Sequence, residues 1–268
     1  MNTDTTTTVA EDDILIAADG PVLRITFNRP QARNAMKLTM YEQLAQTLGA
    51  IDEQSDIRVV VLRGAGDKAF ASGTDISEFR RFTSAQDAIN YENTISRILE
   101  VIESCPVPTI AAISGACTGG GMAIAACCDL RIASSNVRFG MPMARTLGNC
   151  LSASSHARLA ALIGPGRVKD LLLTARLVEA DEARLWGLVS EILPDVDALG
   201  ARAEELAAAI AGHAPLTMRV TKETLAALAA PIAPELEERL LLKAYLSKDF
   251  AEGVSAFLEK RTPTWTGR

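Results

Sequence analysis

Three consecutive glycines, Gly119–Gly121, follow a predicted strand and open a predicted helix. Because glycine has no side chain, a ligand can approach the backbone closely at this point. The first N–H groups of a helix have no partner within the helix, and the helix dipole favours negative charge there. Such a segment can bind a carboxylate, a phosphate or a developing oxyanion. A tight turn that only lets the helix pack on its sheet would use the same glycines.

A second strand end carries similar chemistry. Residues 71–75 read Ala-Ser-Gly-Thr-Asp and follow the apolar run Val59–Leu62. Thr74 or Asp75 could cap the turn or helix that comes next. If this strand end and Gly120 each direct one backbone N–H at the same point, they form an oxyanion hole built from backbone alone.

Side chains that could bind or react with a substrate are concentrated in residues 143–152. Arg145 could hold a substrate carboxylate through paired hydrogen bonds, and Asn149 could bind a carbonyl or a water. Cys150 could act as a nucleophile if its thiolate were stabilised. Each also has a structural explanation: an ion pair for Arg145, inert packing for Cys150, and a structural hydrogen bond for His156. No acid–base pair is visible in the sequence.

Strands and helices alternate along the part of the chain that positions these residues. Leu23, Ile25 and Phe27 alternate with polar residues after an Asp19-Gly20 turn, which predicts a β-hairpin. The predicted strands are residues 14–16, 22–28, 59–62, 109–113 and 130–133, and the helices begin near 39, 85 and 120. This alternation predicts an α/β fold. Beyond residue 152, short strands are expected at 176–178 and 191–193, with final helices at 201–211, 216–228, 234–246 and 250–261.

The two ends of the chain differ from its centre. The first 13 residues are rich in threonine and acidic residues, without the basic and apolar regions of a signal peptide. We therefore predict a disordered tail over residues 1–12, an α/β core over 13–200 and a helical C-terminal region over 201–268. No run of about 18 apolar residues occurs, so no membrane span is expected. These features favour a cytoplasmic location.

Composition argues against several classes of function. The 268 residues include 27 Lys+Arg and 33 Asp+Glu, so the net charge of −6 disfavours nucleic-acid binding. Five cysteines and two histidines without C-x-x-C spacing predict neither a metal site nor a disulfide framework, but small buried hydrophobic residues. Gly64-x-Gly66-x-x-Ala69 fits the dinucleotide fingerprint only nominally, because no helix start follows it. An NAD(P)-dependent oxidoreductase is therefore disfavoured, and the missing G-x-S-x-G disfavours an α/β-hydrolase.

From about residue 14 to residue 267 the chain resembles the crotonase, or enoyl-CoA hydratase/isomerase, superfamily. Each matching piece is weak alone, but their order and spacing together are specific. The pieces are Phe27–Pro30, Asn34–Met36, Ala69–Asp75, Pro108–Gly115, Gly119–Gly121, Cys128–Ala133, Arg138–Gly140, Leu171–Thr174, Trp186–Val189, Glu252-Gly253 and Ala256–Arg261.

The resemblance implies a crotonase-like spiral of ββα repeats with a helical C-terminal trimerisation region. It implies a homotrimer or a dimer of trimers, and an acyl-CoA thioester substrate of the kind found in fatty acid metabolism. The oxyanion N–H groups would be those of Thr74 and Gly120. CoA would enter as part of the substrate, not as a bound cofactor. It would contact Arg29, Ala32, Ala71, Asp75, Ile76, Phe257 and Lys260.

The chain departs from the hydratase pattern at the two positions that handle water. Hydratases of the family carry a Glu three residues after the middle glycine and a second Glu after the Phe-Gly-x-Pro segment. Here these positions are Ala123 and Met143, and neither side chain can move a proton. Simple hydration by the two-Glu mechanism is therefore doubtful. Ser77 also replaces a Lys that some members carry beside CoA.

These observations favour an acyl-CoA enzyme of the hydratase/isomerase type that stabilises a thioester enolate or oxyanion. Isomerisation, decarboxylation, hydrolysis, C–C lysis and a modified hydration all remain open. A different class, an acyl-CoA-binding protein without catalysis, would also keep the backbone oxyanion hole and lose the acid–base pair.

Overall fold

The computed structural model describes residues 12–52, 54–81, 84–227, 248, 249, 252, 256, 259 and 261–268. The chain begins with the predicted hairpin, in which β1 (Ile14–Asp19) pairs antiparallel with β2 (Val22–Phe27). Gly20 has φ 54° at the turn, a left-handed conformation that glycine adopts without steric cost. The hairpin prediction is confirmed.

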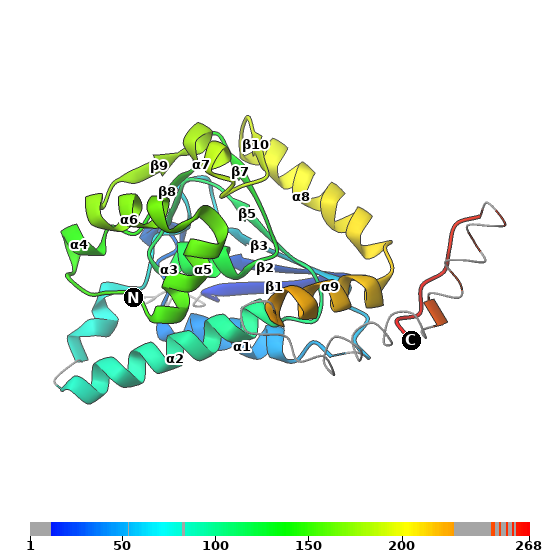
Figure 1. Cartoon of the computed structure of the whole chain (residues 1–268), viewed down its shortest axis with the longest axis horizontal. Coiled ribbons are helices and arrows are strands. Elements are labelled where there is room, and N and C mark those ends of the chain that lie inside the picture. The colour runs from blue at the N-terminus through cyan, green and yellow to red at the C-terminus, as the bar shows by residue number, and fades with distance from the viewer. Residues whose placement is uncertain are drawn as a thin grey trace, which may run out of the picture.

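A six-stranded sheet continues from this hairpin in the order β1-β2-β3-β5-β7-β10 (Figure 1). Its further strands are β3 (Val59–Gly64), β5 (Thr109–Ile113), β7 (Leu130–Ser134) and β10 (Glu191–Leu193). All pairs beyond β1 and β2 are parallel. The uninterrupted apolar runs in β3 and β5 suit strands that are covered on both faces.

A second, four-stranded sheet has the order β4-β6-β8-β9. It consists of β4 (Ala69–Ala71), β6 (Ala116–Thr118), β8 (Arg138–Gly140) and β9 (Leu177–Glu179). Sequence analysis missed the first three strands because three residues are too few for a periodic signal. The two glycine-rich segments therefore follow β4 and β6 directly. They do not follow the longer strands to which the sequence analysis assigned them.

The chain winds between the two sheets as a spiral. The strand pairs β3–β4, β5–β6 and β7–β8 each contribute one strand to each sheet, and a helical segment follows each pair. The α-helices that follow the three strand pairs are α2 (Ala85–Glu103), α3 (Gly120–Cys127) and α4 (Met143–Thr146). The predicted spiral of ββα repeats is confirmed.

Helices complete the described fold. They are α1 (Leu38–Gly49), α5 (Ala153–Ile163), α6 (Pro165–Thr174), α7 (Ala180–Trp186), α8 (Val196–Ala211) and α9 (Pro215–Ala227). α8 begins at Val196 and not at residue 201, because the Asp195 carboxylate caps it by accepting a 2.8 Å hydrogen bond from Ala198 N–H. The predicted boundary at residue 200 thus falls inside α8. The helices predicted at 234–246 and 250–261 lie almost wholly outside the described residues.

The apolar residues form two core clusters. The larger one joins α1, α2 and α3 to both sheets and includes Phe27, Leu44, Phe70 and Phe139. In the smaller one, α8 packs across the other face of the six-stranded sheet, where Leu199 and Ala203 meet residues such as Val59. α8 runs along this sheet in Figure 1. The larger cluster is the one that surrounds the ends of β4 and β6.

Candidate functional site

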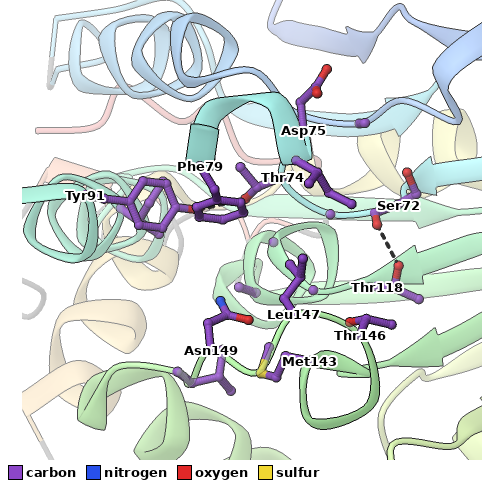
Figure 2. A pocket seen from close by; sticks show the side chains of 18 of the residues that line it. Ser72, Thr74, Asp75, Phe79, Tyr91, Thr118, Met143, Thr146, Leu147 and Asn149 are labelled. Atoms are coloured by element: carbon purple, nitrogen blue, oxygen red, sulfur yellow. Dashed lines mark hydrogen bonds between the residues drawn. The ribbon is translucent and has the colours of Figure 1, made fainter. Parts of the chain in front are cut away.

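A cavity of about 480 Å³ opens at the ends of β4 and β6. Its lining includes residues 72–76, residues 118–120, one face of α2 and the segment from α4 to the start of α5. Figure 2 shows Thr74, Phe79 and Tyr91 on one side of this space, with Met143, Leu147 and Asn149 across from them. The two strand ends and the loop predicted to carry chemistry thus meet in one place.

Glycine at three positions allows the two strand ends to lie side by side. A Cβ atom on Gly73 (φ 113°) would lie 3.9 Å from the Gly120 nitrogen, and one on Gly119 (φ 52°) would lie 3.5 Å from the Gly73 Cα. A Cβ on Gly121 would lie 2.1 Å from the Ala71 carbonyl oxygen, a distance that no side chain could tolerate. The packing interpretation of the glycines is therefore correct, and it brings the ligand-binding backbone into position.

Two backbone N–H groups at this junction are available to a ligand. Within the described residues, neither Thr74 N–H nor Gly120 N–H donates a hydrogen bond. Their neighbours are engaged: Asp75 N–H donates to Met36 at 2.8 Å and Gly119 N–H donates to Gly140 at 2.9 Å. Thr74 and Gly120 both line the cavity, and Gly120 is the first residue of α3. Unpaired N–H groups at a helix N-terminus are suited to bind a negatively charged oxygen.

Three hydroxyl groups lie against these N–H groups, and we call Tyr41, Thr74 and Tyr91 the hydroxyl chain. Thr74 Oγ1 is 3.1 Å from the Tyr41 hydroxyl oxygen and 2.9 Å from that of Tyr91. Phe79 holds the Tyr91 ring in an edge-to-face contact with centroids 5.1 Å apart. Burial raises the pKa of Tyr41 and, less strongly, the pKa of Tyr91. Both phenols therefore remain protonated at neutral pH.

Two carboxylates occur among the described residues that line the cavity. Asp75 accepts hydrogen bonds from Ser77 and forms an ion pair with Arg29 at 3.0 Å, and these contacts lower its pKa. Glu92 on α2 is half-buried, and burial raises its pKa. Within the described part of the chain its carboxylate has neither a hydrogen bond nor an ion pair. Glu92 also lines a smaller adjoining cavity of about 380 Å³.

The loop residues predicted from sequence fall into two groups. Asn149 and Cys150 line both cavities, whereas Arg145 is exposed on α4 and lines neither. Ala123 and Met143 line the main cavity, so apolar side chains occupy the wall where the hydratase carboxylates were expected. All five cysteines are free. Four of them are buried as predicted, but Cys150 is exposed, so the prediction of burial is wrong for this residue. Burial raises the pKa of those four thiols.

Of the residues predicted to contact CoA, some line the cavity and others do not. Ala32, Asp75 and Ile76 line the cavity. Ala71 is buried in β4 and does not line it. Arg29 donates to the Ala35 carbonyl at 2.5 Å as well as to Asp75, so its guanidinium is engaged within the protein. Phe257 and Lys260 lie outside the described residues.

Sequence analysis did not identify Tyr41, Tyr91 or Glu92. A signal for Tyr91 was present, because Tyr91, Ile95 and Leu99 share one helix face and all line the cavity. Tyr41 lies among the apolar residues of α1, and its hydroxyl meets Thr74 only through the tertiary fold. Among the described residues, no group of three or more His, Cys, Asp and Glu side chains could hold a metal ion. None of the described helices combines the length and the apolar character needed to cross a membrane.

Comparison with known proteins decides the family. A family model described as enoyl-CoA hydratase/isomerase matches residues 17–268. The chain belongs to the enoyl-CoA hydratase/isomerase family. The predicted crotonase resemblance is thereby confirmed.

Relatives in this family match almost the full length of the chain. The short-chain-enoyl-CoA hydratase of Clostridium acetobutylicum is 33% identical over 255 residues, covering 93% of this chain and 96% of the relative. The 2,3-dehydroadipyl-CoA hydratase of Escherichia coli is 33% identical over 261 residues, covering 96% and 99%. The crystal structure of an enoyl-CoA hydratase/carnithine racemase from Magnetospirillum magneticum superposes with a TM-score of 0.89, at 36% identity and 97% coverage of both chains.

Proposed function

We propose that this chain transforms an acyl-CoA thioester through an enolate whose oxygen is held by the N–H groups of Thr74 and Gly120. The observation that carries the proposal is this pair of N–H groups at one cavity, neither of which donates to another described residue. The thioester oxygen gains negative charge as the enolate forms, so these donors stabilise the transition state more than the ground state. Removing one donor of this kind typically lowers the rate by about 10²–10³.

The side chains of the cavity favour a proton shift over hydration. Hydration needs groups that hold and activate a water, and the two family positions for them are Ala123 and Met143. Shifting a double bond from C3 to C2 of the acyl chain needs a single base. We propose Glu92 for this role, because its carboxylate lines the cavity unpaired with any described residue and its raised pKa makes it a better proton acceptor.

The proposed reaction balances with Glu92 alone. The C2–H bond breaks, the proton moves to a Glu92 carboxylate oxygen, and the electron pair moves onto the thioester oxygen between Thr74 and Gly120. The Glu92 carboxyl exchanges its proton with solvent and then donates a proton to C4 as the electrons move back to form the C2–C3 double bond, so a product formed in D₂O carries deuterium. CoA remains attached throughout as part of the substrate, along Ala32, Asp75 and Ile76.

Hydration of a 2-enoyl-CoA is the second candidate, because several relatives bear that activity in their names. The two reactions differ in mass and can be separated in one experiment. The full-length protein is incubated in D₂O with saturated, 2-enoyl, 3-enoyl and 3-hydroxyacyl-CoA thioesters, and the products are analysed by mass spectrometry. Isomerisation adds deuterium without adding water, whereas hydration adds one water.

Glu92→Gln tests the proposed base, and Glu100→Gln is its matched control on the same helix. Glu100 is exposed and lines neither cavity. We expect Glu92→Gln to abolish deuterium incorporation and Glu100→Gln to preserve it. Conversion by Glu92→Gln at the wild-type rate would exclude Glu92 as the base. CoA binding without turnover of any thioester would indicate a binding protein and contradict the proposed activity.

We further propose, from the family resemblance, a homotrimer or dimer of trimers located in the cytoplasm. Sedimentation velocity of the purified protein distinguishes these two assemblies from a monomer. A monomer at micromolar concentration would contradict the proposed assembly.

A further inference from the structure

We infer that Tyr41 is a positioning residue whose hydroxyl group fixes the Thr74 and Gly120 N–H groups relative to each other. This inference rests on the proposed function, because these two N–H groups are the proposed donors to the enolate oxygen. Tyr41 acts on the reaction through the two residues that supply the donors.

The Tyr41 hydroxyl contacts both segments that carry the donors. Its oxygen is 3.1 Å from Thr74 Oγ1, within hydrogen-bond distance. The same oxygen lies against Gly120, because a Cβ atom at that position would lie only 1.9 Å from it. Thr74 Oγ1 is close to the same point, at 3.2 Å from that Cβ position. One hydroxyl group therefore touches both the segment that follows β4 and the first residue of α3.

The Tyr41 ring is itself held firmly. Its side chain is fully buried, and it belongs to the larger core cluster together with Leu44 and Phe70. A ring packed in this way keeps one orientation, since a protein core has few voids into which it could turn. The position of the Tyr41 oxygen is therefore set by the core before any ligand binds.

Backbone hydrogen bonds near the two donors lead to different parts of the fold. The residues on either side of Thr74 bond to Met36, whereas the residue before Gly120 bonds to Gly140. These bonds hold each segment separately and do not by themselves set the distance between the two N–H groups. Tyr41 contacts both donor residues and so links their positions directly.

This distance matters because both donors must reach one oxygen. Donors of an oxyanion hole act at about 2.7–3.1 Å from the charged oxygen, and a misplacement of about 1 Å can lower a rate about 10²-fold. Tyr41→Phe keeps the ring and removes the atom that contacts both donors, so the N–H groups remain but are less well aligned. We expect kcat to fall about tenfold with KM unchanged within about twofold, because alignment matters most as charge develops on the oxygen.

A 3-oxoacyl-CoA measures the donors directly, because its acidic C2 forms a stable enolate with strong ultraviolet absorbance. We would bind acetoacetyl-CoA to the full-length protein and titrate pH to obtain the apparent pKa of the bound ligand. The wild type should lower this pKa relative to free ligand. Loss of a whole donor would raise it by about 1–2 pH units, so displacement of the donors in Tyr41→Phe should raise it by about half that amount. Burial raises the pKa of Tyr41, so its phenol stays protonated during the titration.

Thr109→Val is the matched control for a purely structural effect. Thr109 is as deeply buried as Tyr41, its hydroxyl donates to Asp129 at 2.9 Å, and it lines neither cavity. Its loss should lower the urea midpoint, as Tyr41→Phe does, because each variant removes a buried hydrogen bond. The enolate pKa should change in Tyr41→Phe and stay unchanged in Thr109→Val.

Thr74→Val tests the same contact from the other side, because it keeps the backbone N–H and removes the partner of the Tyr41 hydroxyl. It should raise the enolate pKa at least as much as Tyr41→Phe, and the double variant should raise it by less than the sum. An enolate pKa that Thr74→Val leaves unchanged while Gly120→Ala raises it would overturn the inference, even if Tyr41→Phe folds poorly. If the wild-type protein does not lower the pKa at all, the proposed oxyanion site itself is wrong.

Discussion

Gly120→Ala places a methyl group against the hydroxyl chain. The new Cβ would lie 1.9 Å from the Tyr41 hydroxyl oxygen and 3.2 Å from both Tyr41 Cζ and Thr74 Oγ1. Tyr41 is fully buried and cannot rotate into solvent, so either its ring or the start of α3 must move. Overpacking of this kind costs about 1–3 kcal/mol of unfolding free energy. Movement of the Gly120 N–H should lower turnover by about 10²–10³.

Tyr41→Phe provides the matched partner for a double-mutant cycle. Alone, it removes a hydrogen bond and should cost about 0.5–1.5 kcal/mol. In the Gly120→Ala background it also removes the atom that clashes, so the nearest Tyr41 contact becomes the ring carbon at 3.2 Å. The two changes should therefore be less destabilising together than the sum of their separate effects, by about 1–2 kcal/mol.

Urea unfolding of the four proteins, followed by circular dichroism, measures this coupling through midpoints at constant m-value. Activity should not recover in parallel, because the double variant still lacks the Tyr41 donor. Additive free energies within about 0.5 kcal/mol would refute the close approach of Tyr41 to Gly120. Wild-type turnover in Gly120→Ala would refute the role of the Gly120 N–H.

Four other predictions concern separate parts of the molecule. The pKa of Asp75 is lowered in the folded protein, so its stabilising contribution is present above the ordinary carboxyl pKa of 3.8 and is lost as pH falls below it. Asp75→Asn should therefore flatten the profile of urea midpoint against pH below about pH 4, and an unchanged slope there would contradict this. The pKa of Glu92 is raised by burial, so activity should fall on acidification at a pH above the ordinary carboxyl pKa of about 4.3. A rate that is independent of pH down to that value would exclude Glu92 as the base. Asp195→Ala removes the cap of α8 and should lower the free energy of unfolding, measured in urea, by about 1 kcal/mol. Asp197 lies in the first turn of the same helix and does not make the capping bond, so Asp197→Ala should lower it by less. Arg145→Ala should leave KM and kcat unchanged within about twofold, because Arg145 lines neither cavity, and a large rise in KM would restore it as a substrate-binding residue.

The glycines show why the fold and the site depend on each other. Gly73, Gly119 and Gly121 permit a backbone contact that any side chain would prevent or strain. That contact joins the ends of β4 and β6, and Thr118 strengthens it by donating to the Ser72 carbonyl at 2.9 Å, as Figure 2 shows. The two available N–H groups are consequences of this junction, because the adjacent Asp75 and Gly119 N–H groups donate to other backbone carbonyls.

Much of this protein was predictable from its sequence. Periodicity identified the hairpin, the long strands such as Val59–Leu62 and the first three helices, because these signals need only neighbours in the chain. The glycine-rich strand ends identified Thr74 and Gly120 as candidates from residue types and spacing, together with the family resemblance. Ala123 and Met143 already argued against two-carboxylate hydration, since side-chain chemistry does not depend on the fold.

The tertiary structure decided what sequence neighbours cannot encode. The three-residue strands of the second sheet form only through pairing with distant segments, so no local sequence pattern predicted them. Tyr41 and Tyr91 belong to different helices, and their hydroxyl groups meet at Thr74 because the spiral packs α1 and α2 beside β4. Arg145, a candidate by residue type, proved to lie outside the cavity. The local sequence specifies the backbone conformation and which side chains are able to react. Long-range packing decides which of these candidate groups lie in the same site.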